Sequence, residues 1–145
     1  MPSKPEHNRE NYRYFIPIQT RWMDNDTYGH VNNVIYYSYF DTIANTFLIQ
    51  QGQLDIRNDP VIGYVVNSSC NYLQGFSFPD QLEGGFRVNR LGKSSVEYGI
   101  AIFKHGENDP SAYGSFTHVF VDRKSEQSQP IPDKLRKVLS LYLAK

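Results

Sequence analysis

Between Asn33 and Gly52, apolar side chains recur every three or four residues, and this spacing does most to limit what the chain can fold into. It places them on one face of a helix of ~18 residues, about 27 Å long. Many of these residues are β-branched or aromatic and form helices poorly, so the helix would be marginal alone and depends on burial. Gly52 is a suitable C-terminal stop. The residues on the apolar face include Tyr36, Phe40, Ile43 and Phe47.

Strand-like segments stand on both sides of this helix in the sequence. Apolar and polar residues alternate from Tyr12 to Thr20, which predicts a half-buried strand. Pro17 cannot donate to a strand ladder, so we expect one side of that strand to lack a partner there. Four further runs have strand character, and short Gly, Asn and Pro turns between the last three predict an antiparallel meander. These runs are Gly63–Tyr72, Leu82–Leu91, Ser95–Phe103 and Ala112–Asp122.

One central helix and a series of antiparallel strands predict an α+β architecture, in a single domain that spans residues 12–145. Residues 1–11 are polar and show no periodicity, so we expect a flexible N-terminal tail. At the other end, Pro132 begins a regular amphipathic pattern, which predicts a C-terminal surface helix.

The segment that leads into the central helix has the composition of a reactive site. Asp24 and Asp26 flank one residue, and Gly29 permits a backbone reversal that a residue with a Cβ would resist. Either Asn32 or Asn33 is a natural N-cap for the helix that follows. A helix N-terminus carries unpaired N–H groups and positive partial charge, which suit a developing oxyanion. Asp26 lies close enough in sequence to act as a base or a nucleophile at the same carbon.

This segment resembles the entry to the central helix in hot-dog-fold thioesterases of the 4-hydroxybenzoyl-CoA thioesterase family. The resemblance implies a hot-dog fold, in which an antiparallel sheet of about five strands wraps around one long central helix. It also implies edge-to-edge pairing into homodimers or homotetramers, with sites at the subunit boundary. The residues that carry the resemblance are Asp24, Asp26, Gly29, His30 and Tyr36.

The resemblance also implies roles for individual residues. Asp26 falls on the catalytic carboxylate of the family, and Asn33 falls where a backbone N–H polarises the thioester carbonyl. Tyr36 falls on the helix tyrosine that supports the site. Two interpretations of His30 remain open: a polar residue that lines the turn, or a direct aid to the substrate carbonyl.

A second candidate cluster surrounds the turn that follows Leu91. A basic side chain beside exposed N–H groups and hydroxyls suits the phosphates of coenzyme A, and the family often has a Gly-basic-Ser-Ser stretch here. An ordinary solvated turn would have the same composition. Coenzyme A would then be part of the substrate, and no separate cofactor is expected. The candidate phosphate-binding residues are Arg90, Lys93, Ser94 and Ser95, with Arg87 and Arg123 as weaker candidates.

The resemblance therefore implies an acyl-CoA thioester hydrolase that releases a free acid and coenzyme A from a fatty-acyl or aromatic acyl-CoA. The alternative is a non-catalytic hot-dog protein that binds acyl-CoA without turning it over. The sequence does not determine the acyl-chain specificity, the mechanism or the number of subunits.

Composition excludes several other classes of function. Fifteen basic residues balance fifteen acidic ones, so no overall field attracts nucleic acid or an acidic membrane surface. Cys70 is the single cysteine, and no apolar run is long enough for a membrane span, so we expect a cytoplasmic protein. The Asp24–Gly29 segment begins like a calcium loop, but Ile35 stands where a bidentate Glu is required. The four histidines lack paired ligand spacing, and we expect no metal.

Overall fold

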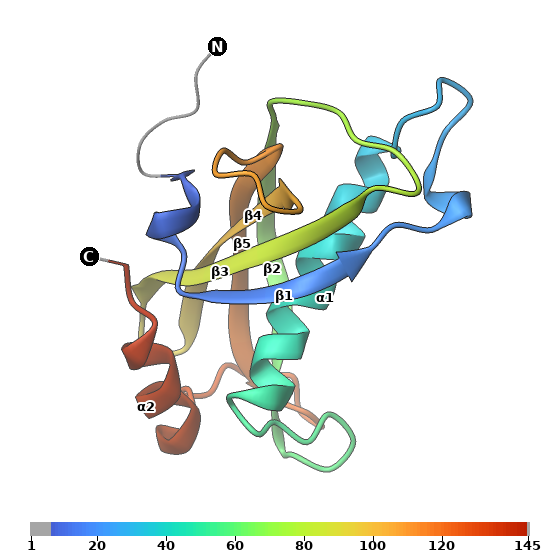
Figure 1. Cartoon of the computed structure of the whole chain (residues 1–145). Coiled ribbons are helices and arrows are strands. Elements are labelled where there is room, and N and C mark those ends of the chain that lie inside the picture. The colour runs from blue at the N-terminus through green and yellow to red at the C-terminus, as the bar shows by residue number, and fades with distance from the viewer. Residues whose placement is uncertain (1–6, 145) are drawn as a thin grey trace.

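The computed structural model describes residues 7–144 of the 145-residue chain. Within them, five strands form one antiparallel sheet in the order β1-β3-β4-β5-β2, and helix α1 lies against one face of it (Figure 1). This confirms the α+β hot-dog architecture. The elements are β1 (Tyr14–Gln19), α1 (Asn33–Gln50), β2 (Val61–Tyr72), β3 (Gln81–Leu91), β4 (Ser95–Lys104), β5 (Ala112–Asp122) and α2 (Asp133–Leu141).

The central helix is buried along its apolar face, as its dependence on packing requires. Phe40, Ile43 and Phe47 are fully buried, and the ring of Phe47 stacks on that of Phe86 in β3 at a centroid distance of 4.2 Å. A Cβ on Gly84 would collide with the side chain of Ile43, so this glycine lets α1 approach the sheet closely. Packing against the sheet thus compensates for the poor helix propensity of α1.

The strand pairing confirms the predicted meander, since β3, β4 and β5 pair in turn as antiparallel neighbours. The outer strands are β1 and β2, and Pro17 lies on β1, where the sheet edge needs no donor. On the opposite edge, β2 begins at Val61, two residues before the predicted start at Gly63. It pairs with β5 along its length, with a bulge between Val65 and Asn67.

The start of the described chain packs on the face of the sheet away from α1. The ring of His7 stacks on Tyr113 at 3.7 Å, and the guanidinium of Arg9 lies 4.9 Å from the centre of the Phe103 ring. Arg9 also donates to Glu83 at 2.7 Å. Within the predicted tail, His7 and Arg9 therefore contact the sheet, while residues 1–6 lie outside the described residues.

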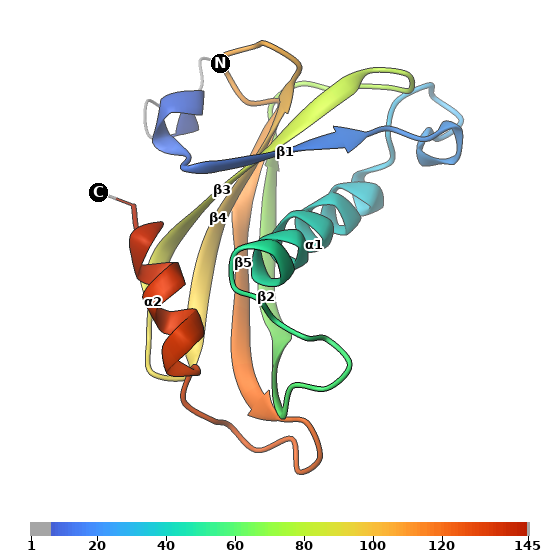
Figure 2. The same cartoon turned by 60° about the horizontal axis from the view of Figure 1, so that its bottom comes forward.

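Helix α2 covers the end of the sheet at which β3 turns into β4 (Figure 2). Its side chains Leu135 and Leu139 are buried, and the following Tyr142 places its ring 4.8 Å from that of Phe47. The remaining residues of α2 are exposed or half-buried, so the prediction of an amphipathic surface helix is confirmed.

Candidate active site

The loop that joins β1 to α1 folds back on itself at Gly29. The Asp26 amide donates to the His30 carbonyl at 2.8 Å, and the Gly29 amide donates to the Asp26 carbonyl at 3.1 Å. Gly29 has a φ of 84°, in the left-handed region that favours glycine. The reversal therefore occurs where the sequence predicts it and sets Asp26 opposite His30.

The carboxylate of Asp26 is half-buried and only partly engaged. Its Oδ1 accepts a hydrogen bond from the Tyr28 amide at 2.9 Å, which closes a local Asx turn. Among residues 7–144, no hydrogen bond or ion pair involves Oδ2 of Asp26. One carboxylate oxygen thus remains available for a ligand, while the other holds the side chain in place.

Asp24 has a different environment, and the two carboxylates of the pair are not equivalent. It is buried, and it accepts hydrogen bonds from the Tyr39 hydroxyl at 2.6 Å and from the Arg21 guanidinium at 2.9 and 3.1 Å. Burial alone would raise the pKa of Asp24, but the bonds from Tyr39 and Arg21 outweigh it and hold the pKa below its usual value. Asp24 therefore stays ionised and ties the loop to α1.

Neither Arg21 nor Tyr39 was predicted from the sequence to support Asp24. Tyr39 follows Tyr36 by three positions on the same helix face, and that spacing is the signal that could have identified it. Burial, followed by the bond to Asp24, raises the pKa of the Tyr39 hydroxyl, so Tyr39 remains a hydrogen-bond donor at any physiological pH.

The N-terminus of α1 resolves the choice of capping residue. Asn32 is the N-cap, since its side-chain oxygen accepts from the Val34 amide at 3.0 Å and its carbonyl accepts from the Ile35 amide at 2.9 Å. Among the described residues, no acceptor bonds the amide of Asn33, the first residue of the helix. An exposed residue with a free N–H at a helix N-terminus can bind an oxyanion.

Three hydrogen bonds fasten this loop to the segment that precedes β3. The Val31 amide donates to the Phe76 carbonyl at 2.8 Å, and the Phe78 amide donates to the Asn25 side chain at 2.9 Å. The Thr20 hydroxyl donates to the Asp80 carbonyl at 2.7 Å. Both ends of the loop are therefore anchored, which keeps Asp26 and the helix start in a fixed relation.

Tyr36 lies in an aromatic cluster under the helix start. Its ring stacks on Phe76 at 4.7 Å and meets the ring of Tyr72 edge to face at 4.9 Å. Burial, with a smaller effect of Cys70, raises the pKa of Tyr36 to about 12. Tyr72, which the sequence analysis missed, comes from the last position of β2 and donates its hydroxyl to the Asn33 carbonyl at 3.5 Å. Tyr36 thus supports this region through its ring.

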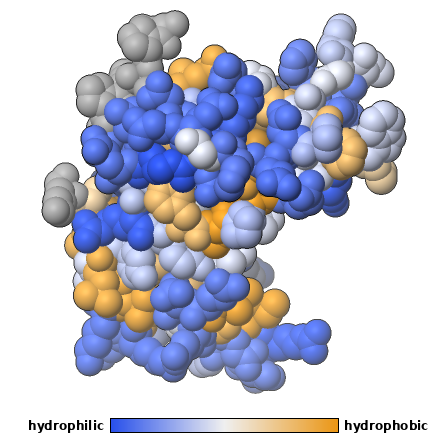
Figure 3. Space-filling view, viewed as in Figure 1, coloured by the Kyte–Doolittle hydropathy of each residue, from blue (hydrophilic) through white to orange (hydrophobic). Residues whose placement is uncertain are grey.

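The tip of the loop is exposed and carries large apolar side chains. His30 is exposed, and its ring lies close to the backbone of Gly75. A Cβ added to Gly75 would be 3.1 Å from Cδ2 of His30. Trp22, Met23 and Tyr28 are 74, 87 and 86% exposed. Figure 3 shows this loop projecting beyond the rest of the molecule at the upper right. The position of His30 is compatible with either interpretation of its role.

One chain does not bring the candidate phosphate-binding residues to this site. Arg90 lies at the end of β3, while Lys93, Ser94 and Ser95 form and follow the turn into β4. The loop around Asp26 is anchored just before β3 begins, so the two clusters are separated by a strand of 11 residues, about 36 Å long. Figure 1 shows them at opposite ends of the sheet.

That turn is held by α2. Arg136 donates its guanidinium to the carbonyls of Gly92 at 2.6 Å and Lys93 at 2.9 Å, and the Ile131 amide also donates to Lys93. The side chain of Lys93 is exposed. Of the weaker candidates, Arg87 is buried beneath Tyr12, and Arg123 bonds the carbonyls of Ile56 and Asp59.

Two further features of the described residues bear on function. Residues 7–144 contain no cluster of three or more His, Cys, Asp or Glu residues placed to hold a metal ion. None of the helices in this part of the chain is long and apolar enough to cross a membrane.

Comparisons with known proteins bear on the family and the fold of this chain. A family model described as the thioesterase-like superfamily matches residues 20–139. The crystal structure of the PA5185 protein from Pseudomonas aeruginosa strain PAO1 is 51% identical with a TM-score of 0.93, over 95% of this chain and 96% of that chain. The YsmA protein of Bacillus subtilis strain 168 is 22% identical over 134 residues, covering 90% of this chain and 88% of that protein.

A more distant structure shares the fold alone. Slr0204 from Synechocystis, a 1,4-dihydroxy-2-naphthoyl-CoA thioesterase, is 14% identical with a TM-score of 0.79, over 88% of this chain and 95% of that chain. The fold and the loop define a hot-dog protein of thioesterase type. Because the family match extends from the end of β1 into α2, this chain belongs to the thioesterase-like superfamily.

Proposed function

We propose that this protein hydrolyses an acyl-CoA thioester to a free acid and coenzyme A. The observation that carries the proposal is the pairing of a partly engaged carboxylate on Asp26 with the free amide of Asn33, on one anchored loop of a thioesterase-superfamily chain. A binding protein would gain little from a carboxylate beside a bound thioester, which favours the enzyme over the non-catalytic alternative.

In the proposed mechanism, the thioester carbonyl oxygen accepts a hydrogen bond from the Asn33 amide. As the carbonyl carbon becomes tetrahedral, negative charge develops on that oxygen and is stabilised by the amide and by the positive end of α1. Asp26 acts in one of two ways. It attacks the carbon and expels the coenzyme A thiolate to leave an anhydride that water cleaves, or it takes a proton from a water molecule that attacks the same carbon.

The test is thiol release from a panel of short-chain, medium-chain, long-chain and aromatic acyl-CoA substrates. We expect Asp26→Asn to lower kcat by about 10² or more, because an amide is neither a base nor an effective nucleophile. Asp41→Asn is the matched control, since Asp41 is an exposed carboxylate on α1 whose side chain bonds Asn45. If Asp26→Asn retains wild-type turnover, or if the wild type binds these thioesters without releasing thiol, the proposal is wrong.

We also propose that the active form contains two chains joined edge to edge through β2. An exposed strand edge of 12 residues needs a partner or some protection, and Tyr64, Val65 and Val66 on it are 39, 47 and 57% exposed. Antiparallel pairing of two β2 strands would place the basic turn at Lys93 of one chain at the same end of the assembly as Asp26 of the other. Sedimentation of the wild type and of Val66→Lys tests this, because a charge at the edge should favour single chains.

A further inference from the structure

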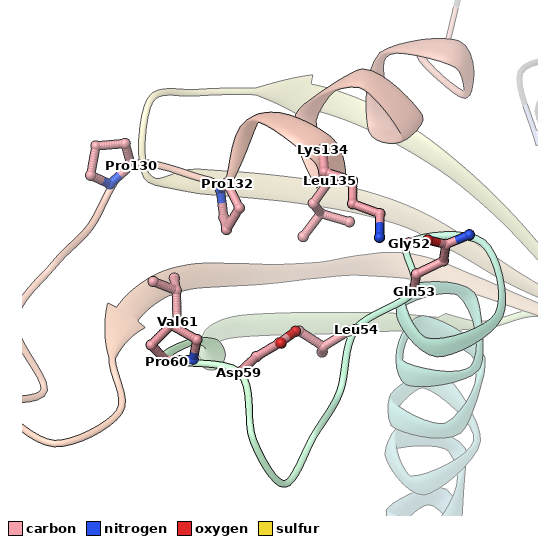
Figure 4. Close-up of a pocket in the computed structure, with 10 residues that line it drawn as sticks. All are labelled: Gly52, Gln53, Leu54, Asp59, Pro60, Val61, Pro130, Pro132, Lys134 and Leu135. Atoms are coloured by element: carbon pink, nitrogen blue, oxygen red, sulfur yellow. The ribbon is translucent and has the colours of Figure 1, made fainter.

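A cavity of about 400 Å³ lies at the C-terminal end of α1, far from the loop that carries Asp26. It is a slot between the first turn of α2 and the segment that connects α1 to β2 (Figure 4). In Figure 4, Leu135 and Pro132 face Val61, Pro60 and Leu54 across the gap. The apolar residues that line it are Leu54, Pro60, Val61, Pro130, Pro132 and Leu135.

The walls of the cavity are held in place by contacts within the chain itself. A Cβ on Gly52 would lie 2.6 Å from Cδ1 of Leu135, so this glycine lets the connecting segment approach α2. Arg123 donates to the carbonyls of Ile56 at 2.7 Å and Asp59 at 2.9 Å, which holds the segment from the side of β5. A preformed apolar slot of this size is typical of a small-molecule site.

Most of the side chains that line the cavity are apolar, and one of its two charged groups is already engaged. The carboxylate of Asp59 accepts a hydrogen bond from the Asp55 amide at 2.9 Å and so is used within its own segment. The amine of Lys134 lies beside Gln53 at one end of the slot in Figure 4. The interior walls are hydrocarbon, which suits an aliphatic chain.

Within one chain, this cavity is remote from the thioester site. Helix α1 has 18 residues and is about 27 Å long, with Asn33 at one end and the cavity beyond the other. On β2, likewise, Val61 lines the cavity, whereas Tyr72, eleven positions later, donates its hydroxyl to the Asn33 carbonyl. A substrate held at Asn33 therefore cannot reach the cavity of the same chain by a short path.

Pairing of two β2 strands removes this separation. The exposed run from Tyr64 to Ser69 is centred on the midpoint of β2, so a twofold pairing that aligns this run with its copy places Val61 of the second chain opposite Tyr72. Neighbouring strands lie about 4.8 Å apart. The cavity of one chain then opens beside the start of α1 in the other.

We infer that the cavity of one protomer binds the distal part of a straight aliphatic acyl chain whose thioester is cleaved at Asp26 and Asn33 of the second protomer. This inference rests on the proposed function and on the pairing through β2. It names a substrate class, the aliphatic acyl-CoAs, and assigns chain-length preference to residues that lie more than a helix length from Asp26 of their own chain.

The first experiment fills the cavity and measures kcat/KM from acetyl-CoA to dodecanoyl-CoA. Leu54→Trp should lower the ratio of long-chain to short-chain kcat/KM by about fourfold for each methylene that is no longer buried. Val61→Phe is a second variant in case Leu54→Trp does not fold. Ile56→Trp is the matched control, since Ile56 is 55% exposed on the same segment and does not line the cavity. An unchanged ratio in both filling variants overturns the inference.

The second experiment tests whether the cavity acts across the interface. Chains carrying Asp26→Asn and Leu54→Trp are given different tags, co-expressed, and the mixed dimers are purified. If the cavity serves the second chain, one of the two sites has both Asp26 and an open cavity, and long-chain activity returns to about half of the wild type. If the cavity serves its own chain, both sites are defective and activity stays near that of the parent variants, which overturns the inference.

The two proposals fail in different ways. A wild type that hydrolyses none of the acyl-CoAs contradicts the proposed function itself. A wild type that hydrolyses them but sediments as a single chain leaves the proposed activity in place and overturns the shared site.

Discussion

The hydrogen bond from Tyr39 to Asp24 offers the sharpest test of how the active-site loop is held. Asp24 is buried with four recorded hydrogen bonds, of which three come from Arg21 and one from the Tyr39 hydroxyl at 2.6 Å. Tyr39→Phe removes the single bond from α1 and leaves the rest of the ring in place. Because bonds to an ionised group contribute about 1.5–3 kcal/mol, and three others remain, we expect a loss of about 2 kcal/mol in unfolding free energy.

The assay is urea unfolding followed by tryptophan fluorescence, together with thermal unfolding. For a chain of this length, 2 kcal/mol corresponds to a fall of about 6 °C in Tm. Tyr36→Phe is the matched control on the same helix. Tyr36 is buried too, but among the described residues no hydrogen bond from its hydroxyl is recorded, so its loss should stay within about 0.5 kcal/mol.

The pH dependence of unfolding gives a second test of this hydrogen bond. The pKa of Asp24 is lower in the folded chain than its usual 3.8, so its contribution to stability is complete above pH 3.8 and is lost as the pH falls through the folded value. The difference between wild type and Tyr39→Phe should therefore be constant near pH 7 and shrink below pH 3.8. Equal losses in Tyr39→Phe and Tyr36→Phe at pH 7 would refute the assignment of Tyr39 as the anchor of Asp24.

Three further perturbations test other parts of the fold. Burial lowers the pKa of His118 to about 4. Between pH 6.5 and 4, the imidazole is therefore protonated in the unfolded chain and neutral in the folded chain. As the pH falls from 6.5 to 4, the unfolding free energy of the wild type, measured in urea, should fall by up to about 3 kcal/mol more than that of His118→Gln. Parallel plots of unfolding free energy against pH for the two proteins would contradict this. Gly84→Ala should cost about 1–3 kcal/mol because the methyl group meets Ile43; an unchanged Tm would show that α1 can move away. Asn32→Ala should cost about 1 kcal/mol through loss of the bond to the Val34 amide, whereas Asn32→Asp should remain close to wild type.

The helix and its entry loop were predictable because they depend on the spacing of nearby residues in the sequence. The spacing of Phe40, Ile43 and Phe47 defines one helix face, and all three side chains are fully buried against the sheet. Gly29 adopts the positive φ that its position required. Asn32 caps α1 because its side-chain oxygen accepts from the amide of Val34, two residues further along the chain. These features depend on neighbours within a turn or two, which is why the sequence reveals them.

Features that depend on distant partners were not predictable in the same way. Asp24 and Asp26 look alike in sequence, yet of the two only Asp24 is buried. Its partner is the hydroxyl of Tyr39, which lies fifteen residues further along the chain and donates a hydrogen bond to it. The turn at Lys93 has a composition suited to phosphate, but nothing in it indicates which end of the sheet it occupies. That placement follows from the length and direction of β3, and it separates the turn from Asp26 in one chain.

Pro17 has a consequence for how many chains can associate through their sheets. A second chain that pairs with β2 leaves β1 as the outer strand on both sides of the pair. Each of these outer strands carries Pro17, which has no N–H to offer to another strand. In the pairing proposed through β2, this proline therefore disfavours the addition of a third sheet at either outer edge, so a single imino acid opposes open-ended growth of the sheet.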